Sequence, residues 1–144
     1  MLVQQILKSK GDDSVTTVTP DTPIAEAAQI LAERRIGGLV VSQDGTTADG
    51  ILSERDIVRG LALRGADCMK SKTADMMTRN PVSCTRQDKS AAVLARMTES
   101  RFRHMPVVED GKLIGIVTIG DVVKAQLQEL EMEKGALEGM IMGY

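Results

Sequence analysis

Two aspartates in this sequence share a local pattern that suits a sugar phosphate. Asp56 lies three residues after Ser53, Asp121 lies three residues after Thr118, and a glycine with two apolar residues comes before each pair. The apolar pair favours a short buried strand, and a hydroxyl followed three residues later by an acid favours the first turn of a helix. The free N–H groups and the positive dipole end at such a junction attract an anion, while a carboxylate accepts hydrogen bonds from paired hydroxyls. A ribose phosphate carries both groups.

The same residues also fit a purely structural role. A hydroxyl, two residues and an acid ahead of an apolar helix form a capping box, and a single match would indicate only that. The stretches 50–56 and 115–121, however, match in register 65 positions apart. The chain therefore contains a duplicated unit.

The composition limits the fold and the partners. With 144 residues, 42% of them hydrophobic, the chain is one domain by length or two small halves that share a core. Its only aromatic residues are Phe102 and Tyr144, so we expect an aliphatic core and an aliphatic, non-stacking pocket for any base. A net charge of −2 from 18 basic and 20 acidic residues predicts neither nucleic acid nor an anionic membrane as a partner.

The cellular location and the state of the two cysteines are predicted from sequence features that the chain lacks. No apolar run reaches the length of a membrane span and the first residues lack the features of a signal peptide, so we expect a cytoplasmic protein. Cys68 and Cys84, 16 positions apart, fit neither a disulfide framework nor a zinc site, so we expect two free thiols. A redox role for either cysteine is left open, because nothing in the sequence indicates an activated thiolate.

The apolar pattern predicts the order strand, helix, strand, strand, helix twice. The first copy has an apolar cluster at 2–7, a turn at 11–14, a strand at 15–19, a helix from 24, strands at 39–41 and from 50, and a helix at 56–63. In the second copy Met76 and Met77 take the place of Ile6 and Leu7, and the buried helix stripe Ile24, Ala27, Ala28 and Leu31 becomes Ser90, Val93, Leu94 and Met97. We therefore expect a first repeat at 1–65 that includes the N-terminal segment, a linker at 66–72, a second repeat at 73–125 and a helical extension at 126–144.

The extension carries more apolar residues than one repeat needs. After Asp121 they continue at spacings of three, four and seven residues as far as Ile141. We interpret this edge as a self-association surface. The alternative is a helix that folds back on its own domain.

Together these features resemble a tandem pair of CBS domains, also called a Bateman module. The resemblance covers essentially the whole chain and rests on the two Gly-apolar-apolar-[Ser/Thr]-x-x-Asp motifs and on the stretches 36–41 and 102–108. It implies an α/β (α+β) fold of two βαββα repeats, packed sheet against sheet about a pseudo-twofold axis, with an extended C-terminal helix. It also implies dimerisation into a disc, and clefts that bind adenosine-containing ligands such as AMP, ADP, ATP, NAD or S-adenosylmethionine.

The resemblance assigns roles to residues of each motif. It implies that Asp56 and Asp121 hold the ribose hydroxyls, with Ser53 and Thr118 near ribose or phosphate. Phosphate needs cations, and the halves place them differently: the first motif supplies Arg55, whereas the second half supplies Arg101, Arg103 and His104 before its strand. Which site is occupied is left open, as is the alternative that one dinucleotide uses groups from both halves.

Further candidates surround the adenine and the phosphate. Backbone groups around six residues are predicted to contact the adenine: Val18, Gly38, Leu39, Val82, Met105 and Pro106. Two alternatives stand beside this prediction. Valine and methionine at strand positions are usually core residues, and 37–38 also fits a simple turn. Lys8 and Lys10 precede a loop and could reach a phosphate, although a solvated pair is the better interpretation.

We expect a stand-alone sensor without chemistry of its own, needing no cofactor and no metal. An adenine nucleotide, AMP first, or ATP, ADP or NAD, would report energy or redox state and modulate an unidentified partner protein through a homodimer. The alternative is a ligand-free structural dimerisation module. A third hypothesis, slow nucleotide hydrolysis through His104, has little support, because His104 lacks a nucleophile partner and a second histidine, and no phosphate loop follows the Gly-x-x-x-x-Gly-Lys pattern.

Overall fold

The computed structural model describes residues 1–11 and 15–143. Asp12, Asp13 and Ser14 of the predicted turn therefore lie outside the described residues. The elements, in chain order, are α1 (Val3–Lys10), β1 (Thr17–Val18), α2 (Ile24–Arg34), β2 (Gly38–Val41), β3 (Gly50–Ser53), α3 (Glu54–Arg64), the 3-10 helix η1 (Gly65–Lys70), α4 (Thr73–Met76), β4 (Thr78–Arg79), α5 (Ser90–Ser100), β5 (His104–Glu109), β6 (Lys112–Thr118) and α6 (Ile119–Met142). The predicted mixed fold with a long C-terminal helix is confirmed.

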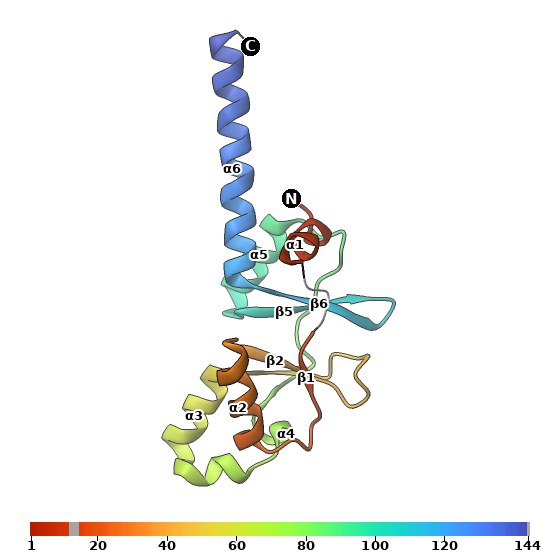
Figure 1. The fold of residues 1–144 in the computed structure, drawn as a ribbon, viewed down its shortest axis with the longest axis vertical. Coiled ribbons are helices and arrows are strands. Elements are labelled where there is room, and N and C mark those ends of the chain that lie inside the picture. The colour runs from red at the N-terminus through yellow and green to blue at the C-terminus, as the bar shows by residue number, and fades with distance from the viewer. Residues whose placement is uncertain (12–14, 144) are drawn as a thin grey trace.

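Two small sheets face each other in the middle of the molecule (Figure 1). The first has the order β1-β2-β3-β4, with β1 parallel to β2 and the other pairs antiparallel. The second is the antiparallel hairpin β5–β6, extended by a single parallel bridge between Cys84 and Val107. Strand β2 is buried along its whole length, as expected for a strand covered on both faces. The backbone N–H of Leu113 donates to the carbonyl of Thr46 at 2.7 Å and joins the hairpin of the second half to a loop of the first.

Each half has its own apolar core, built from the predicted helix stripes. In the first half Ile24, Ala27 and Leu31 of α2 pack with buried strand residues such as Leu39 and Leu52. In the second half Val93 and Met97 of α5 pack with Met105, Val107 and Val117. The stripe position Ser90 is also buried, and its hydroxyl donates to Oε1 of Gln126 at 2.7 Å, which satisfies a polar group in the core.

The segment that precedes each repeat packs on the opposite repeat. Val3 and Ile6 of α1 belong to the second core, whereas Met76 and Met77 pack against the first. The N-terminal segment therefore lies with the second half in space, although in the chain it precedes the first repeat. The boundaries at 65 and 73 stay a prediction about the chain.

The close approach of these segments accounts for the motif glycines. A Cβ on Gly115 would lie 2.7 Å from Cδ2 of Leu7, and one on Gly50 would lie 2.5 Å from Sδ of Met77. Any side chain at either position would displace the residue packed on it. The predicted correspondence between Leu7 and Met77 agrees with this packing.

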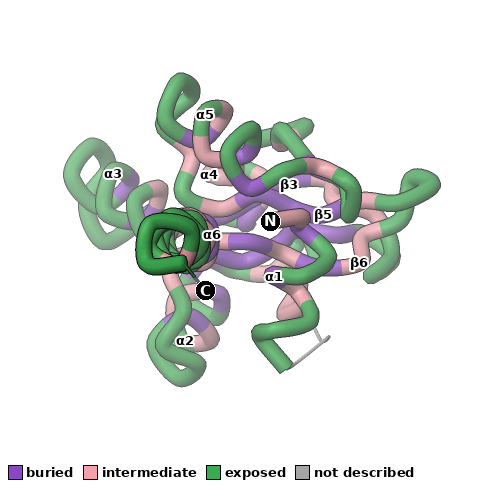
Figure 2. The backbone as a smooth tube through the Cα atoms, turned by 90° about the horizontal axis from the view of Figure 1, so that it is seen from above, coloured by how far each residue is buried: buried purple, intermediate pink, exposed green. Residues whose placement is uncertain are grey.

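Helix α6 continues well beyond the body of the molecule (Figure 1), and Figure 2, which looks along it, shows that most of it is exposed. Only Val122 and Ala125, near its start, are buried. The helix does not fold back on its own domain, and large apolar side chains stand in solvent along it, among them Leu127, Leu130, Leu137 and Ile141. Among the described residues, no helix combines the length and the apolar content that crossing a bilayer requires.

Candidate functional site

Each motif aspartate serves a helix start and keeps one oxygen for other partners. Oδ2 of Asp56 accepts from the N–H of Ser53 at 2.9 Å, and Oγ of Ser53 accepts from the N–H of Asp56 at 3.3 Å. The second motif repeats this geometry, with 2.9 Å from the N–H of Thr118 to Oδ2 of Asp121 and 3.1 Å for the return bond. Both capping boxes are therefore present. The other oxygen, Oδ1, accepts no hydrogen bond from any described residue, so capping and ligand binding are compatible.

The motif of each half faces the strand start of the other half. We call the first hollow, of about 390 Å³, cleft A: it joins Ser53 and Asp56 at the start of α3 with residues 100–104 before β5. The second, cleft B, of about 570 Å³, joins Thr118 at the start of α6 with residues 34–38 before β2. Both volumes suit a small ligand. The two linings correspond through an offset of about 66 positions, so the clefts are related by the pseudo-twofold axis.

This arrangement brings the phosphate-binding candidates of both halves into one cleft. Arg55 comes from the first motif, whereas Arg101 and Arg103 come from the second half, and all three line cleft A. Arg59, one helical turn beyond the motif, adds a fourth guanidinium. The acids that line cleft A are Glu54 and Asp56, and a described ion pair joins only Arg59 to Asp56, at 3.8 Å. Cleft A therefore has an excess of positive charge, which favours an anionic ligand.

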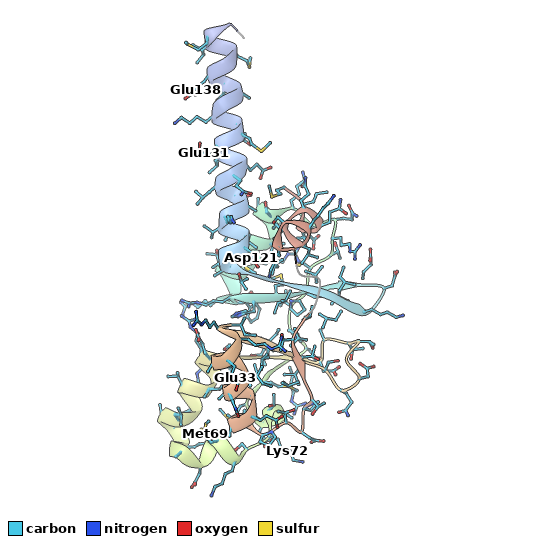
Figure 3. All side chains as sticks on the ribbon, in the orientation of Figure 1. Glu33, Met69, Lys72, Asp121, Glu131 and Glu138 are labelled. Carbon is cyan, nitrogen blue, oxygen red and sulfur yellow. The ribbon has the colours of Figure 1, made fainter. Side chains whose placement is uncertain are left out.

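Cleft B is arranged differently: Thr118 and Lys10 line it, whereas Asp121 does not and lies behind Lys10, which contacts it. Nζ of Lys10 donates to Oδ2 of Asp121 at 2.8 Å and to the carbonyl of Ile116 at 3.0 Å. Burial acts to raise the pKa of Asp121, but the hydrogen bonds from Lys10 and from the N–H of Thr118 lower it, and the net pKa lies below its ordinary value. Figure 3 labels Asp121 at the base of α6, beside the sheets. Lys8 and Lys10 are both exposed, as expected of solvated residues, but Lys10 also makes the two contacts described above.

His104 forms a wall shared by both clefts. Its ring lies against β2, where a Cβ on Gly38 would be 2.9 Å from Cγ of the imidazole. Gly38 is thus no simple turn: it pairs with Ser53 in the sheet and leaves room for the ring. Burial lowers the pKa of His104, Arg103 and Lys10 lower it further, and Glu54 opposes them. The imidazole is therefore neutral at pH 7.

The candidates for contact with adenine divide into two groups. Val82 lines cleft A and Gly38 lines cleft B. Val18 and Leu39 fill the first core, Met105 fills the second, and Pro106 beside it is buried, so a ligand contact through their backbone groups stays a prediction.

One wall of cleft A is aromatic. Phe102 lines it, so the expectation of a purely aliphatic pocket was wrong. The composition correctly excluded a row of aromatic rings, but one ring at the cleft is sufficient for stacking. The corresponding residue of cleft B is Ile36.

Several lining residues were missed by the motif alone. They are Glu54, Arg59 and Thr78 in cleft A, and Thr16, Arg34 and Arg35 in cleft B. The offset of 66 from Arg101 was a usable signal for Arg35, since both residues end a helix with positive φ, 59° and 54°, and line opposite clefts.

Two other features contribute less to a ligand site. A hollow of about 720 Å³ lies between α1 and β6 and adjoins cleft B through Lys10 and Ile116, but neither a motif aspartate nor a motif hydroxyl lines it. Cys68 and Cys84 are free and buried, and burial, with a smaller effect of Asp88, raises the pKa of Cys84 to about 12. Cys84 therefore supplies no thiolate at neutral pH.

Comparisons with known proteins give consistent relatives. The family model of the CBS domain matches twice, at residues 9–63 and 74–128. The solved CBS-domain containing protein ATU1752 from Agrobacterium tumefaciens is 40% identical, covers 88% of this chain and 99% of its own, and has a TM-score of 0.83. CBSX2, solved in complex with AMP, is 33% identical over 79% of this chain and 88% of its own, with a TM-score of 0.67. The CBS domain pair of MJ0100, solved with 5′-methylthioadenosine and S-adenosyl-L-methionine, is 26% identical over 90% of this chain and 98% of its own, with a TM-score of 0.78.

Proposed function

This chain belongs to the CBS-domain family, and on that premise we propose that it is a regulatory CBS pair that binds an adenine nucleotide in cleft A and has no catalytic activity of its own. The proposal rests on one observation: Asp56 lines the same cleft as Arg55, Arg101 and Arg103. The carboxylate suits the ribose hydroxyls and the guanidinium groups suit phosphate. Phe102 offers a face for the adenine.

The charge of cleft A favours some of the ligands that related proteins bind over others. CBSX2 was solved with AMP, and MJ0100 with two adenosine derivatives that carry no phosphate, one of them a sulfonium cation. Four arginines face two acids in cleft A of this chain, so an anionic nucleotide is favoured and a cationic ligand is disfavoured. AMP is therefore our first candidate, before ADP, ATP and NAD.

Thermal denaturation with a ligand panel tests the proposal. AMP at about 100 times its Kd should add about 2.7 kcal/mol of stability, which corresponds to a rise of about 5–10 °C in Tm for a chain of this size. 2′-Deoxy-AMP should give a smaller rise because it lacks one hydroxyl for Asp56, and S-adenosylmethionine should give almost none.

The variant Asp56→Asn keeps an oxygen for the capping box but removes the charge. It should weaken AMP binding by about tenfold or more, the cost of losing a charge-assisted hydrogen bond. Asp67→Asn, at an exposed position on η1, is the matched control and should bind AMP as the unmodified protein does. A panel of adenosine ligands that leaves Tm unchanged would remove the support for a nucleotide sensor.

The alternative, a structural dimerisation module without a ligand, is favoured by one observation. Leu127, Leu130 and Leu137 are each more than half exposed on α6, and Ile141 is 83% exposed. Apolar side chains in such a row commonly meet a second helix, and we propose a homodimer for either function. The alternative predicts a stable dimer whose Tm does not respond to any nucleotide.

A further inference from the structure

The two motif aspartates differ in what already contacts them. Asp56 has its own capping box and a distant guanidinium, Arg59, at 3.8 Å. Asp121 has in addition the ammonium of Lys10, which reaches it from another element at 2.8 Å. The spacing that relates Leu7 to Met77 places Asn80 at the position of Lys10 in the other repeat. No described hydrogen bond or ion pair joins Asn80 to Asp56, so the asymmetry originates in the sequence.

Lys10 competes with a ribose for the same carboxylate. Oδ1 of Asp121 can accept from one ribose hydroxyl, but Oδ2 already accepts from the N–H of Thr118 and from Lys10. A carboxylate oxygen has two acceptor positions, so a second hydroxyl can reach Oδ2 only if Lys10 leaves. A second bond, to the carbonyl of Ile116, keeps the ammonium at this place. An unphosphorylated nucleoside would have to displace Lys10 without offering its charge a new partner.

A phosphorylated nucleoside offers that partner. The side chains of Lys10 and Asp121 are 31% and 24% exposed, so the pair is near solvent and weak enough to be broken. The lysine stem is flexible and its ammonium binds phosphate as a point charge. Arg34 and Arg35 line the same cleft and would complete a phosphate site with Lys10.

We propose that Lys10 selects the ligand of cleft B: it holds Asp121 until a phosphate group draws the ammonium away, so that cleft B admits phosphorylated nucleosides and rejects unphosphorylated ones. This inference rests on the proposed function, since it assumes that the chain binds adenine nucleotides and extends the ribose-binding role of Asp56 to Asp121. Among the described residues no ammonium group contacts Asp56 in cleft A.

Calorimetric titration with AMP and with adenosine tests the role of Lys10. Asp56→Asn weakens cleft A, and in that background the ratio of the two affinities reports on cleft B. Lys10→Met should tighten adenosine binding and weaken AMP binding, so that the preference for AMP falls by about tenfold or more. Lys8→Met, at an exposed position two residues earlier on α1, should leave the preference unchanged. Lys10→Gln carries the same test if the methionine variant does not fold.

The outcomes separate this inference from the proposed function. An unchanged preference in Lys10→Met, or an equal loss for both ligands, would overturn the selection by Lys10. AMP binding that disappears entirely in Asp56→Asn would overturn it as well, because cleft B would then take no nucleotide. Failure of the unmodified protein to bind either compound would instead reject the proposed function.

Discussion

The contact between Gly38 and His104 allows a quantitative test of how the two halves fit together. A Cβ at position 38 would lie 2.9 Å from Cγ and 3.0 Å from Cδ2 and Nδ1 of the imidazole. These atoms are close to the backbone of His104, so the ring has to move by about half an ångström or more rather than swing away. Such overpacking costs about 1–3 kcal/mol. We expect Gly38→Ala to lower Tm by about 3–10 °C.

A double-mutant cycle identifies the cause of that loss. His104→Ala alone removes a half-buried ring and should cost about 1 kcal/mol. In Gly38→Ala/His104→Ala the new methyl group meets no ring, so the double variant should be about 1–2 kcal/mol more stable than the sum of the single changes predicts. The free energies come from urea denaturation at pH 7.5.

Gly135 supplies the matched control. It lies in the exposed part of α6, where a Cβ would have no described side chain within 4 Å beyond its chain neighbours. Gly135→Ala should stabilise the protein by up to about 1 kcal/mol through helix propensity, with no coupling to His104. If the effects of Gly38→Ala and His104→Ala add within about 0.5 kcal/mol, the imidazole of His104 does not pack against Gly38. The placement of His104 between the two clefts would then be wrong.

Two further predictions concern pH and association. His104 is the only histidine, and its pKa in the folded chain lies below the ordinary 6.5, so below about pH 6.5 the unfolded chain binds more protons and the free energy of unfolding falls. Urea denaturation at pH 7.5 and 5.5 should show this fall in the unmodified protein and a smaller one in His104→Gln; parallel pH profiles would refute the assignment. Leu127→Glu/Leu137→Glu places charges in the exposed apolar row of α6, so sedimentation should show weaker self-association. The control Glu131→Gln/Glu138→Gln, at exposed positions labelled in Figure 3, should not weaken self-association.

Local patterns were sufficient to predict most elements and both motifs. They were wrong about the first strand of the second repeat, which is reduced to the bridge at Cys84, and they missed η1 in the predicted linker. The helix stripe from Ile24 to Leu31, the capping boxes at Ser53 and Thr118, and the long final helix depend on neighbours in sequence, and a periodic pattern reports those directly. The duplication strengthened each prediction, because a weak signal occurred twice in register.

What the sequence left open depends on contacts between distant segments. Arg55 and Arg103 belong to different halves, and only the way the sheets face each other brings both into cleft A. The same holds for Lys10, whose partner Asp121 is 111 positions away. Phe102 was misjudged for another reason: a count over the whole chain does not say where a single ring lies.

The segment before each repeat packs on the opposite repeat, and this packing determines whether either repeat can fold as a separate fragment. A fragment ending near residue 65 would lack Met77, which packs on Gly50, and one starting near 73 would lack Leu7, which packs on Gly115. Neither piece would be autonomous, since each would expose an apolar sheet. Two separate single repeats could cover both sheets only by reciprocal domain swapping, which the duplicated chain achieves internally and at a fixed one-to-one ratio.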